Sequence, residues 1–227
     1  MEIVQAAGGT WLYRPEERMA GAPLVFLIGE NCADLEDQAR RAQKAGLNCA
    51  LCGVPVADWD GQLSPWPGPA VFGGNSDFSG RADEFLAELL RIGPEVLTQA
   101  GCESACIAGY SLAGLFALYA ATLSDWFSGV AAMSASVWYE GFTDYLRAHA
   151  PRNPQTRFYL ALGRAEERTR HPVLRTVGDR MREVRQILAK AQQRDVPLVM
   201  HDGGHYSGVP ARIAAGVAWL ARGTEQA

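Results

Sequence analysis

The sequence of 227 residues lacks the features that mark membrane, secreted and nucleic-acid-binding proteins. No uncharged run approaches the ~18 residues that a membrane-spanning helix needs. The first five residues contain no basic stretch followed by an apolar one, so no secretory signal is predicted. The formal net charge is −4 with no long run of a single sign, which argues against a nucleic-acid-binding face. We therefore expect a cytoplasmic protein whose partners include neither a membrane nor a nucleic acid.

Cysteines are few, and their number is odd. The five are Cys32, Cys49, Cys52, Cys102 and Cys106, and three of them lie in or beside apolar runs. This pattern fits reduced core residues better than a disulfide framework. Cys49 and Cys52 have the spacing of a zinc or redox motif, but three positions along a strand point two side chains to opposite faces. Because no second ligand pair follows, we expect no metal site.

The residues that are present predict an α/β protein. Apolar residues make up 48% of the chain and charged residues 20%, as in an ordinary globular protein. Buried strands and helices alternate without a repeat or a break in composition, which indicates a single domain over residues 1–227. We expect an open, mostly parallel sheet with helices on both faces, a three-layer αβα arrangement. The predicted strands are 23–28, 47–54, 106–108, 128–134, 157–162 and 197–200, after an edge hairpin in 1–14; the predicted helices are 33–45, 81–99, 112 onward, 142–149, 172–193 and 210–220.

The longest segment without periodicity is residues 55–80. It is rich in proline and glycine and carries Trp59, Trp66, Phe72 and Phe78. Loops of this length are usually functional or disordered, and so much aromatic surface argues against disorder. We interpret the segment as a lid or pocket wall. The alternative is that its aromatic side chains plug the edge of the sheet.

Ser111 lies where a buried strand turns into a helix. The apolar run 106–108 precedes it, and a Leu- and Ala-rich run begins at Leu112. Gly109, Ala113 and Gly114 keep the turn small, which is needed because strand and helix almost touch there. A serine on so sharp a turn has a strained backbone and an exposed hydroxyl, as in a nucleophile elbow. The alternative is a serine that merely caps the helix.

A serine nucleophile needs a base, because its hydroxyl reacts poorly at neutral pH until a proton is removed. Four histidines are available, and His149 and His171 lie at positions typical of the surface. His205 follows two glycines in the loop after the last predicted strand, so its imidazole can reach Ser111. His201, at the end of that strand, is the less favoured alternative.

The third member of a triad orients the imidazole and stabilises its cation. In this type of sheet it follows the preceding strand, commonly three residues after a glycine at the strand end. Counting from Gly163 gives Glu166, with Glu167 as the alternative, and both could also belong to a solvated charge run. The order Ser, acid, His is that of the α/β-hydrolases. The oxyanion hole would be the N–H of Leu112 and one N–H after the first buried strand, from Glu30 or Asn31.

Motifs along nearly the whole chain resemble the esterase D and enterochelin-esterase-like group of bacterial α/β-hydrolases. They are Gly109–Phe116, Asp58-Trp59 with Ser64–Pro67, Ser134–Trp138, Leu162–Glu167 and Gly203–His205. The resemblance implies the α/β-hydrolase fold, a triad of Ser111, Glu166 and His205, hydrolysis of carboxylic esters and no cofactor. The chain departs from the group in having Ala113 in place of a glycine and a short N-terminal region, which leaves room for an edge strand to be missing.

The predicted function is therefore that of a serine esterase acting on a small-molecule ester through an acyl-enzyme. Trp59, Trp66, Trp138 and Tyr206 are candidate pocket walls that favour a small or aromatic group, unless they serve only in packing. An acyltransferase or thioesterase would use the same triad, and a non-catalytic binding protein could have the same fold. Cysteine-nucleophile chemistry is excluded because no cysteine occupies the elbow. The sequence predicts neither the particular ester nor the oligomeric state.

Overall fold

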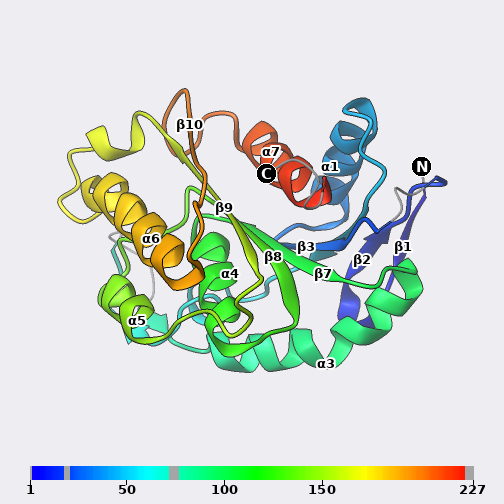
Figure 1. Cartoon of the computed structure of the whole chain (residues 1–227), viewed down its shortest axis with the longest axis horizontal. Helices are drawn as coiled ribbons and strands as arrows, with labels where there is room; N and C mark the ends of the chain where they lie inside the picture. Colours follow the sequence, from blue (N-terminus) through cyan, green and yellow to red (C-terminus); the bar gives the residue numbers. More distant parts are fainter. Residues whose placement is uncertain (1, 18–20, 72–76, 223–227) are drawn as a thin grey trace.

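A computed structural model describes residues 2–17, 21–71 and 77–222 of the chain. Within these residues, one eight-stranded sheet has the order β1-β2-β4-β3-β7-β8-β9-β10 (Figure 1). The strands from β4 to β10 in this order are parallel to one another. Their bounds are Ile3–Gln5 (β1), Trp11–Tyr13 (β2), Leu24–Ile28 (β3), Ala50–Val54 (β4), Ala105–Tyr110 (β7), Phe127–Met133 (β8), Arg157–Gly163 (β9) and Leu198–His201 (β10). The prediction of an open, mostly parallel sheet is confirmed.

The N-terminal hairpin completes one edge of the sheet. β1 pairs antiparallel with β2, and β2 pairs antiparallel with β4, so that Leu12 lies opposite Cys52. The N-terminal region thus supplies the edge strand β1 and its neighbour β2. The first buried strand, β3, lies well inside the sheet, between β4 and β7.

Helices cover both faces of the sheet. Figure 1 shows α1 (Cys32–Lys44) and α7 (Val209–Ala221) on one face, and α3 (Ala82–Ala100), α4 (Leu112–Leu123), α5 (Phe142–Ala148) and α6 (Val177–Gln192) on the other. Strand β3 illustrates why the strands read as unbroken apolar runs. Leu24, Phe26 and Ile28 enter the core under α3 and α4, whereas Val25 and Leu27 enter the core under α1 and α7. A strand buried on both faces needs an apolar residue at every position.

Cys49 and Cys52 lie on opposite faces, as their spacing predicts. Cys49 belongs to the core on the α1 side, and Cys52 belongs to the core on the α3 side. Both are free thiols, and burial raises the pKa of each to about 12. Within the described residues, no group of three or more His, Cys, Asp or Glu side chains is arranged to hold a metal ion.

Two predicted boundaries are corrected. The segment 55–80 is more ordered than a plain loop, because it contains α2 (Trp59–Gln62) and the antiparallel pair β5 (Pro67–Gly68) and β6 (Phe78–Ser79). Residues 72–76, including Phe72, lie outside the described residues. The helix predicted from 172 starts at Val177, because residues Leu174–Thr176 form a 3-10 turn closed by a hydrogen bond from the Thr176 N–H to the Val173 carbonyl.

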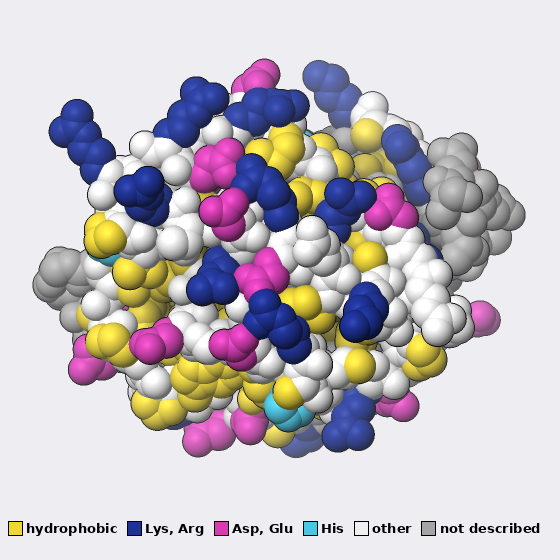
Figure 2. Space-filling view, turned by 60° about the vertical axis from the view of Figure 1, so that its left-hand side comes forward, with side chains coloured by type: hydrophobic (Ala, Val, Ile, Leu, Met, Phe, Trp, Pro, Cys, Tyr) yellow, Lys and Arg dark blue, Asp and Glu magenta, His cyan; other side chains and the backbone are white. Residues whose placement is uncertain are grey.

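The outer surface mixes both signs of charge. Figure 2 shows basic and acidic side chains side by side on the face that carries α5 and α6. Ion pairs account for this arrangement: Arg182 of α6 contacts Asp179 and Glu167, and Arg185 contacts Asp195. Among the described residues, no helix combines the length and the apolar character required to cross a bilayer.

Candidate active site

Ser111 lies on the sharp turn between β7 and α4. Its backbone has φ 59° and ψ −122°, a strained conformation for a residue with a side chain. The turn is so tight that a Cβ on Gly109 would lie 2.2 Å from the Ala113 carbonyl oxygen, and one on Gly114 would lie 2.9 Å from the Cβ of Ala135. Glycine is therefore required at 109 and 114. Ala113 is fully buried and is accommodated without a glycine.

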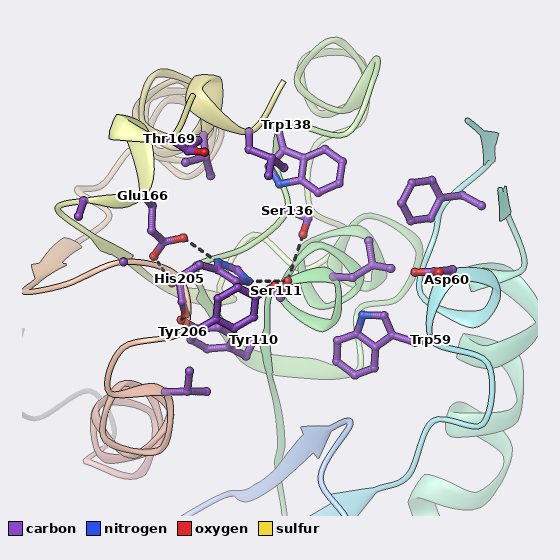
Figure 3. A pocket seen from close by; sticks show the side chains of 18 residues that line it. Trp59, Asp60, Tyr110, Ser111, Ser136, Trp138, Glu166, Thr169, His205 and Tyr206 are labelled. Atoms are coloured by element: carbon purple, nitrogen blue, oxygen red, sulfur yellow. Dashed lines mark hydrogen bonds and ion pairs between the residues drawn. The ribbon is translucent and has the colours of Figure 1, made fainter. Parts of the chain in front are cut away.

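The Ser111 hydroxyl meets the imidazole of His205. The distance from Ser111 Oγ to His205 Nε2 is 3.0 Å, and Ser136 Oγ lies 3.4 Å from the same hydroxyl (Figure 3). The backbone of Ser111 is anchored independently, since its N–H donates to the Met133 carbonyl and its carbonyl accepts from the Ser136 N–H. The end of β8 thus holds the elbow in place.

His205 is held from two sides in the loop after β10. Its Nδ1 lies 2.8 Å from Glu166 Oε2, and the Tyr110 hydroxyl donates to its backbone carbonyl. Gly203, with φ 88°, supplies the left-handed turn that brings the loop back over the sheet. Because a carboxylate accepts at Nδ1, the neutral imidazole carries its proton there. Nε2 is then free to accept the proton of Ser111.

Glu166 is a buried carboxylate with hydrogen bonds to both oxygens. Oε2 contacts His205, while Oε1 accepts from the Gly163 N–H at 2.7 Å, the Ser134 hydroxyl at 2.6 Å and Arg212 Nη1 at 2.7 Å. Burial acts to raise the pKa of Glu166, but the hydrogen bonds from His205, Ser134 and Gly163 outweigh it, and the pKa lies below its usual value. Glu166 therefore stays ionised at neutral pH.

Arg212 of α7 is a member of the site that sequence reasoning missed. Its side chain is 1% exposed and donates to Glu166, Ser134 and the Tyr110 hydroxyl, and also to the Ser207 carbonyl in the histidine loop. A single arginine in an otherwise apolar helix was the available signal. A buried cation needs partners, and here they are the Glu166 carboxylate and the loop that carries His205.

The alternatives for acid and base lie elsewhere. Glu167 points away from His205 and pairs with Arg182 of α6 at 2.8 Å. His149 stacks on Tyr145 at the surface, and no contact joins His171 or His201 to Ser111 among the described residues. Burial and the nearby Arg212 lower the pKa of His201. Of the four histidines, the structure brings only His205 to the serine.

A cavity of about 740 Å³ opens over Ser111. It is lined mainly by apolar and aromatic side chains, and its size suits a small organic molecule. Three of the four predicted wall residues, Trp59, Trp138 and Tyr206, line it. Trp66 does not line it; the indole N–H donates to the Glu140 carbonyl, and the ring packs among Tyr119, Tyr139, Phe142 and Tyr145.

Of the three predicted oxyanion donors, only Leu112 lines the cavity. Leu112 is the first residue of α4, so its N–H has no partner within the helix, and the residue lines the cavity beside Ser111. The N–H of Glu30 faces the Leu27 carbonyl at 3.5 Å, and that of Asn31 faces the Asp34 carboxylate at 3.4 Å in a capping box. Neither Glu30 nor Asn31 lines the cavity. The second donor therefore stays a prediction.

The sheet order and the strand-to-helix elbow define the α/β-hydrolase fold. One similar solved structure is an IroE-like serine hydrolase from Shewanella oneidensis, with a TM-score of 0.70 and 16% identity over 97% of this chain and 79% of that one. The siderophore hydrolase EstB from Aspergillus nidulans has a TM-score of 0.69 and 17% identity over 97% of this chain and 93% of that one. The enterobactin esterase from Shigella flexneri has a TM-score of 0.66 and 18% identity over 96% of this chain and 58% of that one.

The resemblance to enterochelin-type esterases is thus confirmed at the level of the fold. The chain spans little more than half of the Shigella enzyme, but most of the other two. No protein-family model matches the chain, and no curated protein sequence matches it either. Because the identities are below 20%, the choice of reaction depends on the residues of the site itself.

Proposed function

We propose that the protein is a serine hydrolase that cleaves carboxylic esters. The observation that carries this proposal is the continuous line of contacts from Ser111 through His205 to Glu166 at the floor of the cavity, with heavy-atom distances of 3.0 and 2.8 Å. These lengths are within hydrogen-bond reach, as a nucleophile, its base and the group that orients the base require. The fold is shared with three hydrolases, which agrees with the same chemistry.

In the proposed acylation step, His205 Nε2 takes the proton of Ser111 while Oγ attacks the ester carbonyl carbon. The carbonyl oxygen becomes an oxyanion that accepts a hydrogen bond from the Leu112 N–H, and one such donor is typically worth ~3 kcal/mol. The bond to the alcohol oxygen then breaks, and His205 returns the proton to that oxygen. Glu166 stabilises the imidazolium that exists between the two proton transfers.

Deacylation repeats these roles with water as the nucleophile. His205 accepts a proton from water, whose oxygen attacks the acyl carbon, and the proton passes to Ser111 Oγ as the acid is released. Glu166 can serve both steps because its depressed pKa keeps it anionic. Arg212, Ser134 and the Gly163 N–H all donate to the other carboxylate oxygen, Oε1, so the carboxylate is fixed in the orientation that His205 needs.

The aromatic walls Trp59, Trp138 and Tyr206 favour esters with a small or aromatic group. A panel of 4-nitrophenyl esters of rising acyl length tests the function, and we expect turnover of the short-chain members. The names of two structural neighbours add siderophore esters to the panel. S111A should abolish turnover, and H205A should reduce kcat/KM at least ~10³-fold. Undiminished activity of either variant would refute the proposed roles.

Product analysis separates hydrolysis from acyl transfer. In the proposed hydrolase, the acid is the main product even when an alcohol acceptor is added at millimolar concentration. Preferential formation of the new ester would make the protein an acyltransferase instead. A thioester with the same acyl group, tested in parallel, shows whether an oxoester is the preferred substrate.

A further inference from the structure

Apart from the imidazole of His205, the charged side chains that line the cavity are carboxylates. Of the 18 lining residues that the structure describes, Asp60 and Glu166 carry carboxylates, and none is a lysine or arginine. Glu166 is already paired with Arg212 and His205. Asp60, in the short helix α2, has no such pairing within the part of the chain that the structure describes.

The carboxylate of Asp60 has no hydrogen-bond or ion-pair partner among the described residues. The one bond to this residue uses its backbone carbonyl, which accepts from the Ser64 hydroxyl. Asp58, and not Asp60, caps the start of α2: its carboxylate accepts from the Gly61 N–H and pairs with Arg81. The Arg81 guanidinium at this end of α2 is thus engaged by Asp58. Burial, followed by the charge of Asp58, raises the pKa of Asp60.

Three aromatic residues lie on the wall of the cavity that this unpaired carboxylate also lines. Trp59, Phe78 and Trp138 line the same cavity, and the rings of Phe78 and Trp138 lie 6.4 Å apart between centroids. Trp59 lines the cavity and is 40% exposed. Figure 3 shows Asp60 and Trp59 across the pocket from Glu166 and His205, with Ser111 between the two sides.

A carboxylate beside accessible aromatic faces is suited to an alkylammonium group. The rings attract the cation through their quadrupoles, and the carboxylate adds a direct charge interaction that partial burial strengthens. An anionic group would meet Asp60 and Glu166 without any lining cation to offset them. A neutral group that covered Asp60 would take water away from the carboxylate without giving it a partner, which costs free energy.

We propose that Asp60, with Trp59, Phe78 and Trp138, forms a subsite for a positively charged alkylammonium group on the acyl part of the ester. This inference rests on the proposed esterase function. We place the ammonium group on the acyl part of the ester because His205 must protonate the leaving alcohol oxygen. The alcohol part therefore lies on the His205 side of the cavity. The acyl chain then extends toward the opposite wall, where Asp60 lies. The substrates would be esters of ω-ammonio acids.

Two isosteric esters with one leaving group test the subsite. They are 4-nitrophenyl 4-(trimethylammonio)butyrate, which is cationic, and 4-nitrophenyl 5,5-dimethylhexanoate, which replaces the nitrogen by carbon. The readout is the ratio of kcat/KM, cationic over neutral, within each variant. We expect a ratio in wild type about tenfold above that in D60N. D202N is the matched control: it removes one carboxylate from the same edge of the sheet, outside the cavity, and should keep the wild-type ratio.

The outcomes separate the subsite from the function. Equal ratios in wild type and D60N, with Ser111-dependent turnover, would overturn the subsite and leave the esterase proposal intact. Lack of turnover of both esters would count against the esterase proposal alone, and the subsite would then be judged by binding. Titration calorimetry should show that wild type and D202N bind phenyltrimethylammonium with similar affinity. The affinity of D60N for the same cation should be at least tenfold lower. Absence of that difference would refute the subsite.

Discussion

The guanidinium of Arg212 and the carboxylate of Glu166 form a buried ion pair directly behind the imidazole of His205, with 2.7 Å between Nη1 and Oε1. Both side chains are almost wholly excluded from solvent, at 1% and 4% exposure. Arg212 also reaches the histidine loop through the Ser207 carbonyl. One arginine on α7 therefore links the Glu166 carboxylate after β9 to the loop after β10.

Removal of Arg212 should destabilise the fold through the carboxylate that is left behind. Loss of one partner of a buried pair typically costs ~3 kcal/mol or more, so R212M should lower the free energy of unfolding by about that amount in urea denaturation. R182M, which breaks the exposed pairs with Glu167 and Asp179, should cost about 1 kcal/mol or less. In the double variant R212M/E166Q the loss should be smaller than the sum of the single losses. A fully additive double variant would show that the pair is not coupled.

Neighbouring glutamates offer a test of the triad acid with a matched control. In the proposed mechanism, E166Q removes the negative charge that stabilises the His205 imidazolium and permits the wrong imidazole tautomer, so kcat/KM should fall at least ~10³-fold. E167Q alters only a surface pair with Arg182 and should stay within about threefold of wild type. The check is hydrolysis of 4-nitrophenyl acetate. Equal losses in the two variants would contradict the assignment of Glu166.

Trp66 and Trp138 should affect different quantities. W66L removes a ring packed among four aromatic residues, together with the N–H bond to Glu140. It should lower the free energy of unfolding by ~2–4 kcal/mol with no change in KM. W138A removes part of the cavity wall and should raise KM by up to about tenfold. A raised KM in W66L would mean that Trp66 reaches the substrate after all.

The pH dependence of stability should carry a contribution from Glu30. Burial, with smaller contributions from Asp34 and Asp37, raises the pKa of Glu30 from 4.5 to about 7 in the folded protein. The folded form therefore holds this proton more tightly than the unfolded chain, so the free energy of unfolding falls as pH rises from 4.5 to about 7. The cost is fully present above that range.

E30Q removes this titration. The stability of E30Q relative to wild type should increase between about pH 4 and pH 8, by at most ~3 kcal/mol. Urea unfolding at several pH values measures the difference. The matched substitution E36Q changes an exposed glutamate of the same helix region, which pairs with Arg40, and its effect should vary by less than ~1 kcal/mol over the same range. An E30Q effect that is independent of pH would contradict the raised pKa.

Much of the site could be predicted because its signals are local. The small residues around Ser111 specify a turn that only a strand-to-helix elbow needs, and the structure shows why at Gly109. His205 and Glu166 were predicted from their positions after strands, because parallel strands bring their carboxyl ends to one edge of the sheet. The strand assignments were reliable for the same reason: residues buried on both faces leave unbroken apolar runs.

The residues that escaped prediction depend on packing between distant segments. Arg212 acquires its role only when α7 docks over β9: a lone arginine in an apolar helix is a signal in the sequence, but it does not identify the partners of the side chain. Trp66 and Trp138 look alike in the sequence, yet one faces an aromatic core and the other faces the cavity. The Asp60 carboxylate differs from that of Asp58 in lining the cavity and in lacking a partner among the described residues, and both are properties of the folded chain.

The most direct test of the account is the covalent capture of Ser111. A fluorophosphonate probe reacts with an activated serine, and intact mass with peptide mapping identifies the adduct. We predict one adduct per chain, on Ser111, absent in S111A and formed at least ~10²-fold more slowly in H205A. Folded wild-type protein that takes up no probe, or labelling that survives in S111A, would contradict the claim that Ser111 is the nucleophile.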